Sequence, residues 1–244
     1  MNKLLQNLVY STIGKLTRTL YRITVLPYRI QTPLRTVPQE VRKLAVESSA
    51  KFVMSNMRTA LIFDSITEFW DYALAQVNPS NAIGLEFGVW KGESIRYFAN
   101  KLPNFQFFGF DSFEGLEEDW VGSRQPKGYF HLYGELPEVP ENVKLIKGFY
   151  TDTLPNFIEW EFKETFNIPL IHLDSDTYKP TKFVLSELKA FITPGTVLIF
   201  DEYLGLPFWE QTEHRAFTEF ISETGNHFRY IAISNLAVAI QITS

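Results

Sequence analysis

The chain has 244 residues, of which 45% are hydrophobic and 16% aromatic, enough for one large core. It contains no cysteine, which excludes disulfides and thiolate metal sites. No apolar run reaches the roughly 18 to 20 residues that cross a bilayer, and no secretory signal pattern opens the chain, so we expect a soluble cytoplasmic protein.

Charge is distributed unevenly along the chain, whose formal net charge is −5. Residues 1–45 are basic, with Glu40 as their one acidic residue, and the remainder is acidic. Apolar residues recur at helical spacing in this segment and predict an amphipathic helix: Leu5, Val9, Leu16, Leu20 and Ile23. We expect this helix to pack on the main domain or on a second subunit, which favours a homo-oligomer. Peripheral contact with an anionic membrane is the alternative.

Prolines at positions 27, 33 and 38 predict a linker near residues 27–40. We therefore divide the chain into a basic N-terminal segment, 1–45, and a main domain, 46–244. Nucleic acid is not an expected partner, because the main domain is acidic and shows no basic groove pattern.

The main domain begins with helical periodicity over residues 49–79, interpreted as two helices. Strand and helix patterns then alternate. The predicted strands are 82–89, 105–113, 143–150, 168–174, 196–203, 228–234 and 236–242. The predicted helices are 92–103, 153–166, 179–195 and 213–225. This order predicts an α/β, Rossmann-like fold. Its seven-stranded, mostly parallel sheet has an antiparallel last strand, helices on both faces and extra N-terminal helices.

Polar residues gather where the predicted strands end, which is where ligands bind in such sheets. The stretch LEFGVWKGES carries Glu86, Gly88, Gly92 and Ser94, a spacing that differs from the GxGxxG of dinucleotide sites. Gly88 permits a tight turn, and Gly92 opens a helix whose N–H groups suit a carboxylate. Asp111 ends the next strand, where an acid accepts hydrogen bonds from both hydroxyls of a ribose.

This ExGxxxGxS pattern with a following acid resembles class I S-adenosylmethionine-dependent methyltransferases. The fuller series LEFGVWKGES, FGFDSFEGL, KGFYTDTLP, HLDSDTY and FDEY is similar to the macrocin O-methyltransferase (TylF-like) family. That family methylates sugar hydroxyls of natural products. The resemblance runs from about residue 50 to the C-terminus, so the basic segment lies outside it.

The resemblance implies a set of cofactor contacts. Glu86, Gly88 and Ser94 would meet the methionine part of S-adenosylmethionine, beside the helix start at Gly92, and Asp111 would meet the ribose. Further contacts to the adenosine would come from the residues after the second and third strands: Ser112, Phe113, Phe149 and Asp152.

Four acids at two strand ends then require an explanation. Asp174, Asp201 and Glu202 offer the hard oxygen ligands that magnesium prefers, and the resemblance implies a Mg²⁺ ion at these positions. The ion would bind a substrate diol, leaving Asp176 as general base. Asp176 or Thr177 could instead cap the following helix. His172 is interpreted as a satisfied core histidine.

The predicted function is magnesium-assisted methyl transfer from S-adenosylmethionine to a hydroxyl of a sugar, glycosylated natural product or glycan. Methylation of a catechol-like diol is the alternative among enzymes. A non-catalytic adenosyl-binding module that acts through the basic helix is the alternative of another class. The segment 117–142, rich in glycine, proline and aromatic residues, predicts a lid that selects the acceptor.

Overall fold

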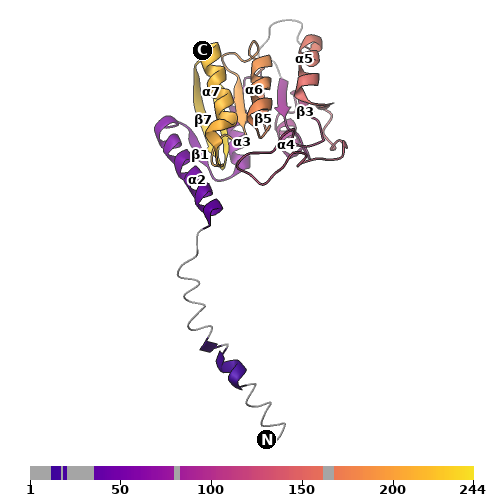
Figure 1. Ribbon diagram of the computed structural model, residues 1–244. Helices are drawn as coiled ribbons and strands as arrows, with labels where there is room; N and C mark the ends of the chain where they lie inside the picture. The colour runs from indigo at the N-terminus through magenta and orange to yellow at the C-terminus, as the bar shows by residue number, and fades with distance from the viewer. Residues whose placement is uncertain (1–11, 18, 21–35, 80–82, 162–167) are drawn as a thin grey trace. The chain divides into compact units, whose positions relative to one another are not determined.

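The computed structural model describes residues 12–17, 19–20, 36–79, 83–161 and 168–244 (Figure 1). The chain divides into two units, Met1–Val41 and Arg42–Ser244. In the first unit, residues 12–17 and 19–20 are helical, and Leu16 and Leu20 of the predicted apolar stripe are exposed. The other members of that stripe lie outside the described residues: Leu5, Val9 and Ile23.

Helix α2 (Val37–Asn56) begins inside the stretch predicted to be a linker. The backbone N–H of Thr36 donates to the side chain of Gln39, which satisfies one of the free N–H groups at this helix start. Pro38 lies in the first turn, where a missing N–H costs nothing. The linker prediction is therefore wrong for residues 37–40, and residues 27–35 lie outside the described part of the chain.

The described strands form one eight-stranded sheet with the order β1-β7-β8-β6-β5-β2-β3-β4. Neighbouring strands are parallel except for β8, which runs antiparallel to β6 and β7. The bounds are β1 (Leu61–Phe63), β2 (Ile83–Phe87), β3 (Gln106–Asp111), β4 (Val143–Lys147), β5 (Leu170–Leu173), β6 (Val197–Phe200), β7 (Phe228–Ser234) and β8 (Ala237–Ile242). The predicted fold class and the antiparallel last strand are confirmed.

The sheet has one strand more than the seven predicted. Strand β1 lies within the region interpreted as two helices, between α2 and α3 (Ile66–Ala75). It has three residues and pairs with β7, while Leu61 and Ile62 remain exposed. A strand this short has no alternation to detect, so its pairing partner decides its conformation rather than its own sequence.

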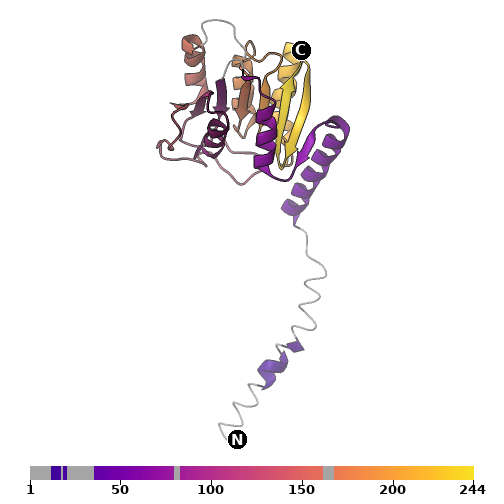
Figure 2. The same ribbon diagram turned by 180° about the vertical axis from the view of Figure 1, so that it is seen from behind.

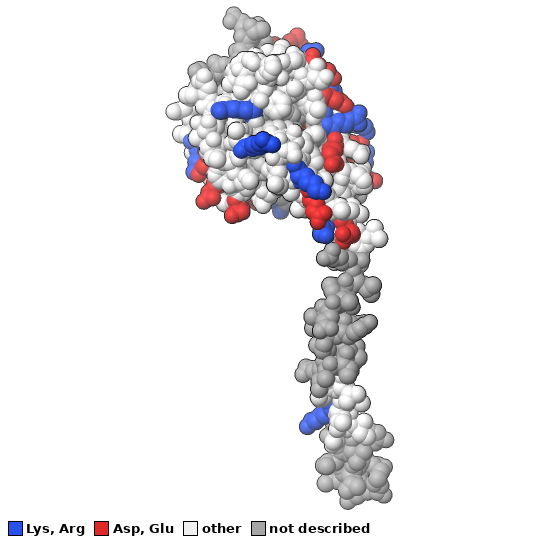
Figure 3. Space-filling model, turned by 90° about the vertical axis from the view of Figure 1, so that its left-hand side faces the viewer, with Lys and Arg blue, Asp and Glu red and all other residues white. Residues whose placement is uncertain are grey.

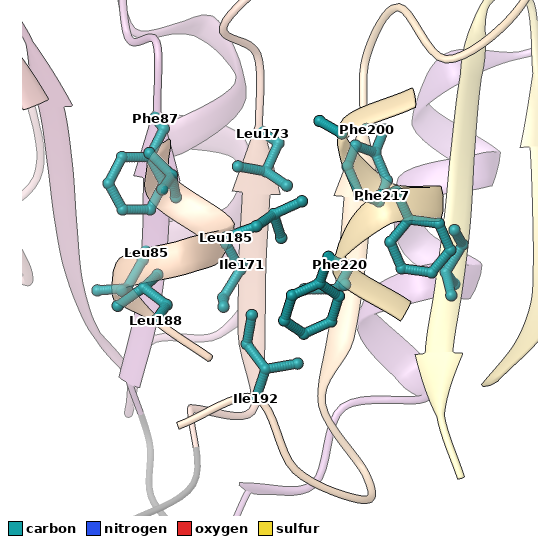
Figure 4. Close-up of a cluster of buried hydrophobic side chains, with 14 of the residues drawn as sticks. Leu85, Phe87, Ile171, Leu173, Leu185, Leu188, Ile192, Phe200, Phe217 and Phe220 are labelled. Atoms are coloured by element: carbon teal, nitrogen blue, oxygen red, sulfur yellow. The ribbon is translucent and has the colours of Figure 1, made fainter. Parts of the chain in front are cut away.

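Helices cover both faces of the sheet, as Figures 1 and 2 show. Helices α3 and α4 (Glu93–Lys101) lie on one face, over a cluster of buried side chains that includes Phe69, Phe98 and Phe107. The opposite face carries α5 (Tyr150–Glu161), α6 (Tyr178–Glu187) and α7 (Glu213–Thr224). Buried side chains on this opposite face form the cluster drawn in Figure 4, which includes Leu85, Phe87, Ile171, Leu173, Phe200 and Phe217.

Backbone hydrogen bonds continue past the ends of the central strands. The N–H of Gly88 donates to Phe110, that of Asp174 to Phe87, and that of Asp201 to Leu173, over 3.0, 2.8 and 3.0 Å. Along the chain, β3 and β4 add to one side of β2 and β5 pairs on its other side, so the strand order reverses next to β2. A ligand crevice is expected at such a reversal, outside the carboxyl ends of the strands.

The surface of the main unit carries scattered charges and exposed apolar side chains. Figure 3 shows Lys and Arg standing singly in a mostly uncharged surface on the side where Figure 1 draws β1. Exposed apolar side chains include Leu61 and Ile62 of β1 and Val46 and Met54 of α2. In the described part of the chain, no helix is both long and apolar enough to cross a membrane. The homo-oligomer stays a prediction.

Candidate active site

A cavity of about 270 Å³ lies at the carboxyl ends of the central strands. Eight of the predicted site residues line it: Gly88, Asp111, Ser112, Phe149, Asp174, Asp176, Asp201 and Glu202. Five others lie outside its lining: Glu86, Gly92, Ser94, Phe113 and Asp152. Further lining residues that the site prediction did not include are Trp90, Gly115, Leu116, Glu117, Phe130, Tyr150, Ser175, Thr177 and Pro180.

Gly88 brings the loop after β2 against the end of β5. Its φ of +94° lies in the region that favours glycine. A Cβ at this position would stand 1.8 Å from the carbonyl oxygen of Asp174, so any other residue would separate the two segments. The glycine predicted to permit a tight turn therefore also sets the contact between the ends of β2 and β5.

Asp111 is held by three backbone N–H groups. Its Oδ2 accepts from Val89 and Trp90, at 2.9 and 2.8 Å, and its Oδ1 accepts from Phe113 at 2.7 Å. Hydrogen bonds to an ionised acceptor are among the stronger ones, so this carboxylate fixes the loop after β2 to the chain after β3. Trp90 and Phe113 have positive φ values of 45° and 58°, which these bonds help to maintain.

Glu86 lies fully buried, and both of its carboxylate oxygens have partners. Oε1 accepts from the hydroxyl of Ser94 at 3.0 Å, and Oε2 lies 2.9 Å from Nδ1 of His172. Burial raises the pKa of Glu86, against the lowering effect of His172 and Ser94. The Glu86 and Ser94 predicted to touch the cofactor thus bond to each other.

His172 joins Glu86 to the acids of the neighbouring strands. Its Nε2 has no hydrogen-bond partner among the described residues and lies 3.9 Å from Oδ1 of Asp201. Although burial opposes it, the contacts with Asp201 and Glu86 raise the pKa of His172 well above its ordinary value. The same contact lowers the pKa of Asp201, again against the effect of burial. The sequence predicted a core histidine with its hydrogen bonds satisfied. In the described structure only Nδ1 of His172 has a hydrogen-bond partner.

Three acids converge at the ends of β5 and β6. Asp174, Asp176 and Glu202 each place one carboxylate oxygen within 4.8 Å of the other two. The predicted ligand set contained Asp201 in place of Asp176, but Asp201 lies against His172. Glu202 Oε2 is buried and has no hydrogen-bond partner in the described structure. A buried carboxylate oxygen without a partner is costly, and a hard cation would satisfy it.

Without a cation, protonation is the way in which these acids can reduce the repulsion between their charges. Burial, followed by the charges of Asp201 and Asp176, raises the pKa of Asp174 well above its ordinary value. Burial and the charges of Asp201 and Asp174 do the same for Glu202. Burial and the charges of Asp201 and Asp111 raise the pKa of Asp176 to about 7. Like charges in a poorly solvated site cannot all ionise without compensation.

Glu213 is a buried acid at the start of the predicted helix 213–225 that the site prediction did not include. It begins α7 and has no exposed surface, and its Oε2 accepts the backbone N–H of Glu202 at 3.1 Å. Its Oε1 has no partner among the described residues. Burial and the charge of Asp201 raise its pKa well above the ordinary value. The sequence offered one signal for a role at the site: Glu213 begins the first α-helix after the strand end that carries Asp201 and Glu202.

The segment after β3 folds over the cavity with its own hydrogen bonds. The N–H groups of Leu132 and Gly134 donate to the carbonyl of Phe113, and Lys147 donates to the carbonyl of Gly134. The rings of Phe130 and Trp90 meet edge to face with centroids 5.3 Å apart. Part of the predicted lid therefore lines the cavity together with the loop after β2.

Comparisons with known proteins show which proteins this chain is similar to. Residues 85–203 match a protein family described as a methyltransferase domain. A relative from Streptomyces olivaceus, 8-demethyl-8-(2,3-dimethoxy-alpha-L-rhamnosyl)-tetracenomycin-C 4'-O-methyltransferase, is 27% identical over 144 residues. The match spans 49% of this chain and 52% of the relative, so the chain covers about half the length of that protein.

Solved methyltransferase structures share the fold. CalS11, a calicheamicin methyltransferase, has a TM-score of 0.58 and 19% identity, with 85% of this chain and 93% of that chain covered. Its apo structure, described as a TDP-rhamnose 3'-O-methyltransferase, has a TM-score of 0.52 and 21% identity, with 84% and 92% covered. The O-methyltransferase NovP has a TM-score of 0.52 and 18% identity, with 85% and 100% covered.

Together these findings confirm the predicted fold and the resemblance to methyltransferases. The chain shares the fold of these solved methyltransferases, and its residues 85–203 match a methyltransferase domain.

Proposed function

We propose that the chain is an S-adenosylmethionine-dependent O-methyltransferase that methylates a sugar hydroxyl. The proposal rests on one observation. Asp111 lines the same cavity as the acids that follow β5 and β6, at the place where the strand order reverses. One half of this cavity suits a ribose, and the other half suits a metal-bound diol. The sugar acceptor is suggested by the curated relative, whose name describes methylation of a rhamnosyl group.

The cofactor would occupy the half of the cavity beside the loop after β2. Gly88, Asp111, Ser112 and Phe149 line this half and are proposed to contact it. Glu86, Ser94 and His172 would support the loop from beneath through their buried hydrogen bonds. Gly92, Phe113 and Asp152 stay predicted contacts that the cavity lining does not include.

The acids of β5 and β6 fit a divalent cation, because Glu202 has a buried oxygen without a partner and lies close to two other carboxylates. We propose Asp174, Asp201 and Glu202 as magnesium ligands. Bound Mg²⁺ would orient the acceptor diol and lower the pKa of its hydroxyl. The alternative is that Asp176, which the geometry groups with Asp174 and Glu202, replaces Asp201 as a ligand.

Asp176 is proposed as the general base. It lines the cavity beside Asp174 and Glu202 and is not among the three proposed ligands, so its carboxylate is available to accept a proton. Asp176 would accept the hydroxyl proton as the oxygen attacks the methyl group. The new carbon–oxygen bond forms as the carbon–sulfur bond breaks, and S-adenosylhomocysteine leaves. The rest of the rate enhancement would come from holding the two reactants in line.

Calorimetric titration of S-adenosylhomocysteine tests the cofactor half first. The product should bind the wild-type protein in the micromolar range with magnesium present, and Asp111→Ala should abolish binding. Repeating the titration in EDTA shows whether the metal contributes to affinity. Absence of binding to the wild-type protein in both conditions would overturn the proposed function.

A further inference from the structure

The main chain around Glu202 is anchored by three hydrogen bonds from different parts of the fold. The N–H of Asp201 donates to the last residue of β5, and that of Leu204 donates to the turn between β7 and β8, over 3.0 and 3.1 Å. The N–H of Glu202 lies between these two and donates to a side chain, Oε2 of Glu213, over 3.1 Å. The anchor at Glu202 itself therefore depends on one distant residue.

Glu213 is held firmly enough to serve as that anchor. Its side chain has no exposed surface, and it is the first residue of α7. One turn further on, the ring of Phe217 contacts that of Phe200, the last residue of β6, with centroids 5.4 Å apart. The packing of α7 on β6 thus fixes where the Glu213 carboxylate lies, and the carboxylate in turn fixes the residues that follow β6.

The carboxylate of Glu213 is set apart from the proposed metal site. The three carboxylates that lie within 4.8 Å of one another belong to Asp174, Asp176 and Glu202. Glu213 is outside that group and outside the cavity lining. Glu202, in contrast, belongs to both proposed sets of magnesium ligands, and its buried Oε2 has no partner among the described residues. Glu213 can therefore reach a bound ion only through Glu202.

We infer that Glu213 is a positioning residue, which holds the main chain of Glu202 so that the Glu202 carboxylate faces the bound cation. Its role is that of a hydrogen-bond acceptor of the right length, not that of an additional negative charge. The inference rests on the magnesium site of the proposed function. Residues that orient a metal ligand commonly contribute 10- to 100-fold to metal affinity.

The test is calorimetric titration of magnesium chloride into the full-length protein and two variants that separate length from charge. Glu213→Gln keeps an acceptor oxygen at the same distance and removes the charge. Glu213→Asp keeps the carboxylate but is one methylene shorter. We expect Gln to keep Mg²⁺ affinity within about threefold of the wild type, and Asp to lower it by about 10- to 100-fold. Affinity for S-adenosylhomocysteine should be unchanged in both variants.

Thr196→Val is the matched control for a general loss of stability. Thr196 is fully buried at the opposite end of β6, and its hydroxyl donates to the carbonyl of Ile168 over 2.8 Å. Removing this bond should lower the urea midpoint and leave Mg²⁺ affinity at the wild-type value. A loss of Mg²⁺ affinity as large as that of Glu213→Asp would overturn the inference, because any destabilisation of β6 would then have the same effect.

Three further results would also overturn it. Unchanged Mg²⁺ affinity in Glu213→Asp would show that the bond does not position Glu202. Equal losses in the Asp and Gln variants would assign the effect to the charge of Glu213. Absence of Mg²⁺ binding to the wild-type protein would remove the ion that Glu202 is inferred to face. Failure of the whole proposed function is distinguishable, because S-adenosylhomocysteine would then not bind the wild-type protein either.

Discussion

The two halves of the cavity differ in how their acids are satisfied. In the half proposed to bind the cofactor, Asp111 accepts three backbone N–H bonds and so already holds the loop after β2 in place. In the half proposed to bind the metal, Glu202 has a buried oxygen without a partner among the described residues, and Asp174 and Asp176 have raised pKa values. The folded chain alone supplies the hydrogen bonds that Asp111 accepts. The acids that follow β5 and β6 need protons or a cation to balance their charge.

This difference shows that acids at equivalent strand ends need not have equivalent roles. Backbone N–H groups stabilise the ionised form of a carboxylate, whereas burial beside other carboxylates disfavours it. Asp111 is therefore suited to a neutral ligand that exchanges hydrogen bonds. The acids of β5 and β6 are suited to a ligand that brings positive charge. The predictions below test this contrast, beginning with the largest expected effect.

Asp176→Asn should reduce turnover by about 10²- to 10⁴-fold, the usual effect of removing a general base. Cofactor affinity should be unchanged, because Asp176 lies in the metal half. Steady-state kinetics with a sugar acceptor and calorimetry with S-adenosylhomocysteine measure the two quantities. Magnesium affinity separates the roles: retained affinity fits a base, and lost affinity would mean that Asp176 is a ligand in place of Asp201.

Asp111→Ala should abolish cofactor binding and also destabilise the metal-free protein. The N–H groups of Val89, Trp90 and Phe113 would lose their acceptor, at a cost of about 1–3 kcal/mol for each group left buried and unsatisfied. Urea unfolding measures this loss. Asp111→Asn is the control, because it keeps one acceptor oxygen. Unchanged stability in Asp111→Ala would show that these bonds do not hold the loop.

The metal-free protein should lose stability as the pH rises from about 4 to about 7. In this window the folded state binds more protons than the unfolded chain, because the pKa of Asp176 is raised from 3.8 to about 7. The loss should be a few kcal/mol, on the order of 1.4 kcal/mol for each pKa unit. Urea midpoints between about pH 4 and 7 in EDTA check the slope.

Magnesium should flatten this dependence on pH, since a cation replaces the protons. Without metal, Asp176→Asn should reduce this dependence and not remove it, because the raised pKa values of Asp174, Glu202 and Glu213 remain. Stability that rises with pH across the window in EDTA would contradict the assigned burial of these acids.

The smallest expected effect concerns the support of the metal half by α2. Ser49 Oγ accepts the N–H of Gly205 at 2.8 Å, in the loop that links Glu202 to Glu213. Ser49→Ala should lower the free energy of unfolding by about 1–2 kcal/mol, because that N–H would lose its partner. Ser222→Ala, on the exposed face of α7, should change stability by less than about 0.5 kcal/mol. Equal effects of the two substitutions would show that α2 does not support this loop.

The sequence predicted which side chains follow a strand. It did not predict which neighbours those side chains contact in the folded chain. Alternating strands and helices predicted the sheet and the edge at which Asp111, Asp174 and Glu202 meet. They could not predict that Asp201 turns to His172 or that Glu86 is buried beneath the loop, because both depend on contacts between distant strands.

Two further differences between the prediction and the structure also come from contacts between distant parts of the chain. The strand character of Leu61–Phe63 comes from pairing with β7, and the buried state of Glu213 comes from the backbone of Glu202. Neither contact has a local pattern, whereas strand ends and helix starts do. Local elements were therefore predictable, and the orientation of the buried acids required the folded chain.

The contact at Gly88 has a consequence for how the two ligands would influence each other. Because the main chain of the loop lies directly against the carbonyl of Asp174, a movement of the loop on one side reaches the acids on the other without an intervening side chain. Occupancy of one half would then change the affinity of the other by a common factor, in both directions, as thermodynamic reciprocity requires. A residue without a side chain would thus make the two proposed binding equilibria dependent on each other.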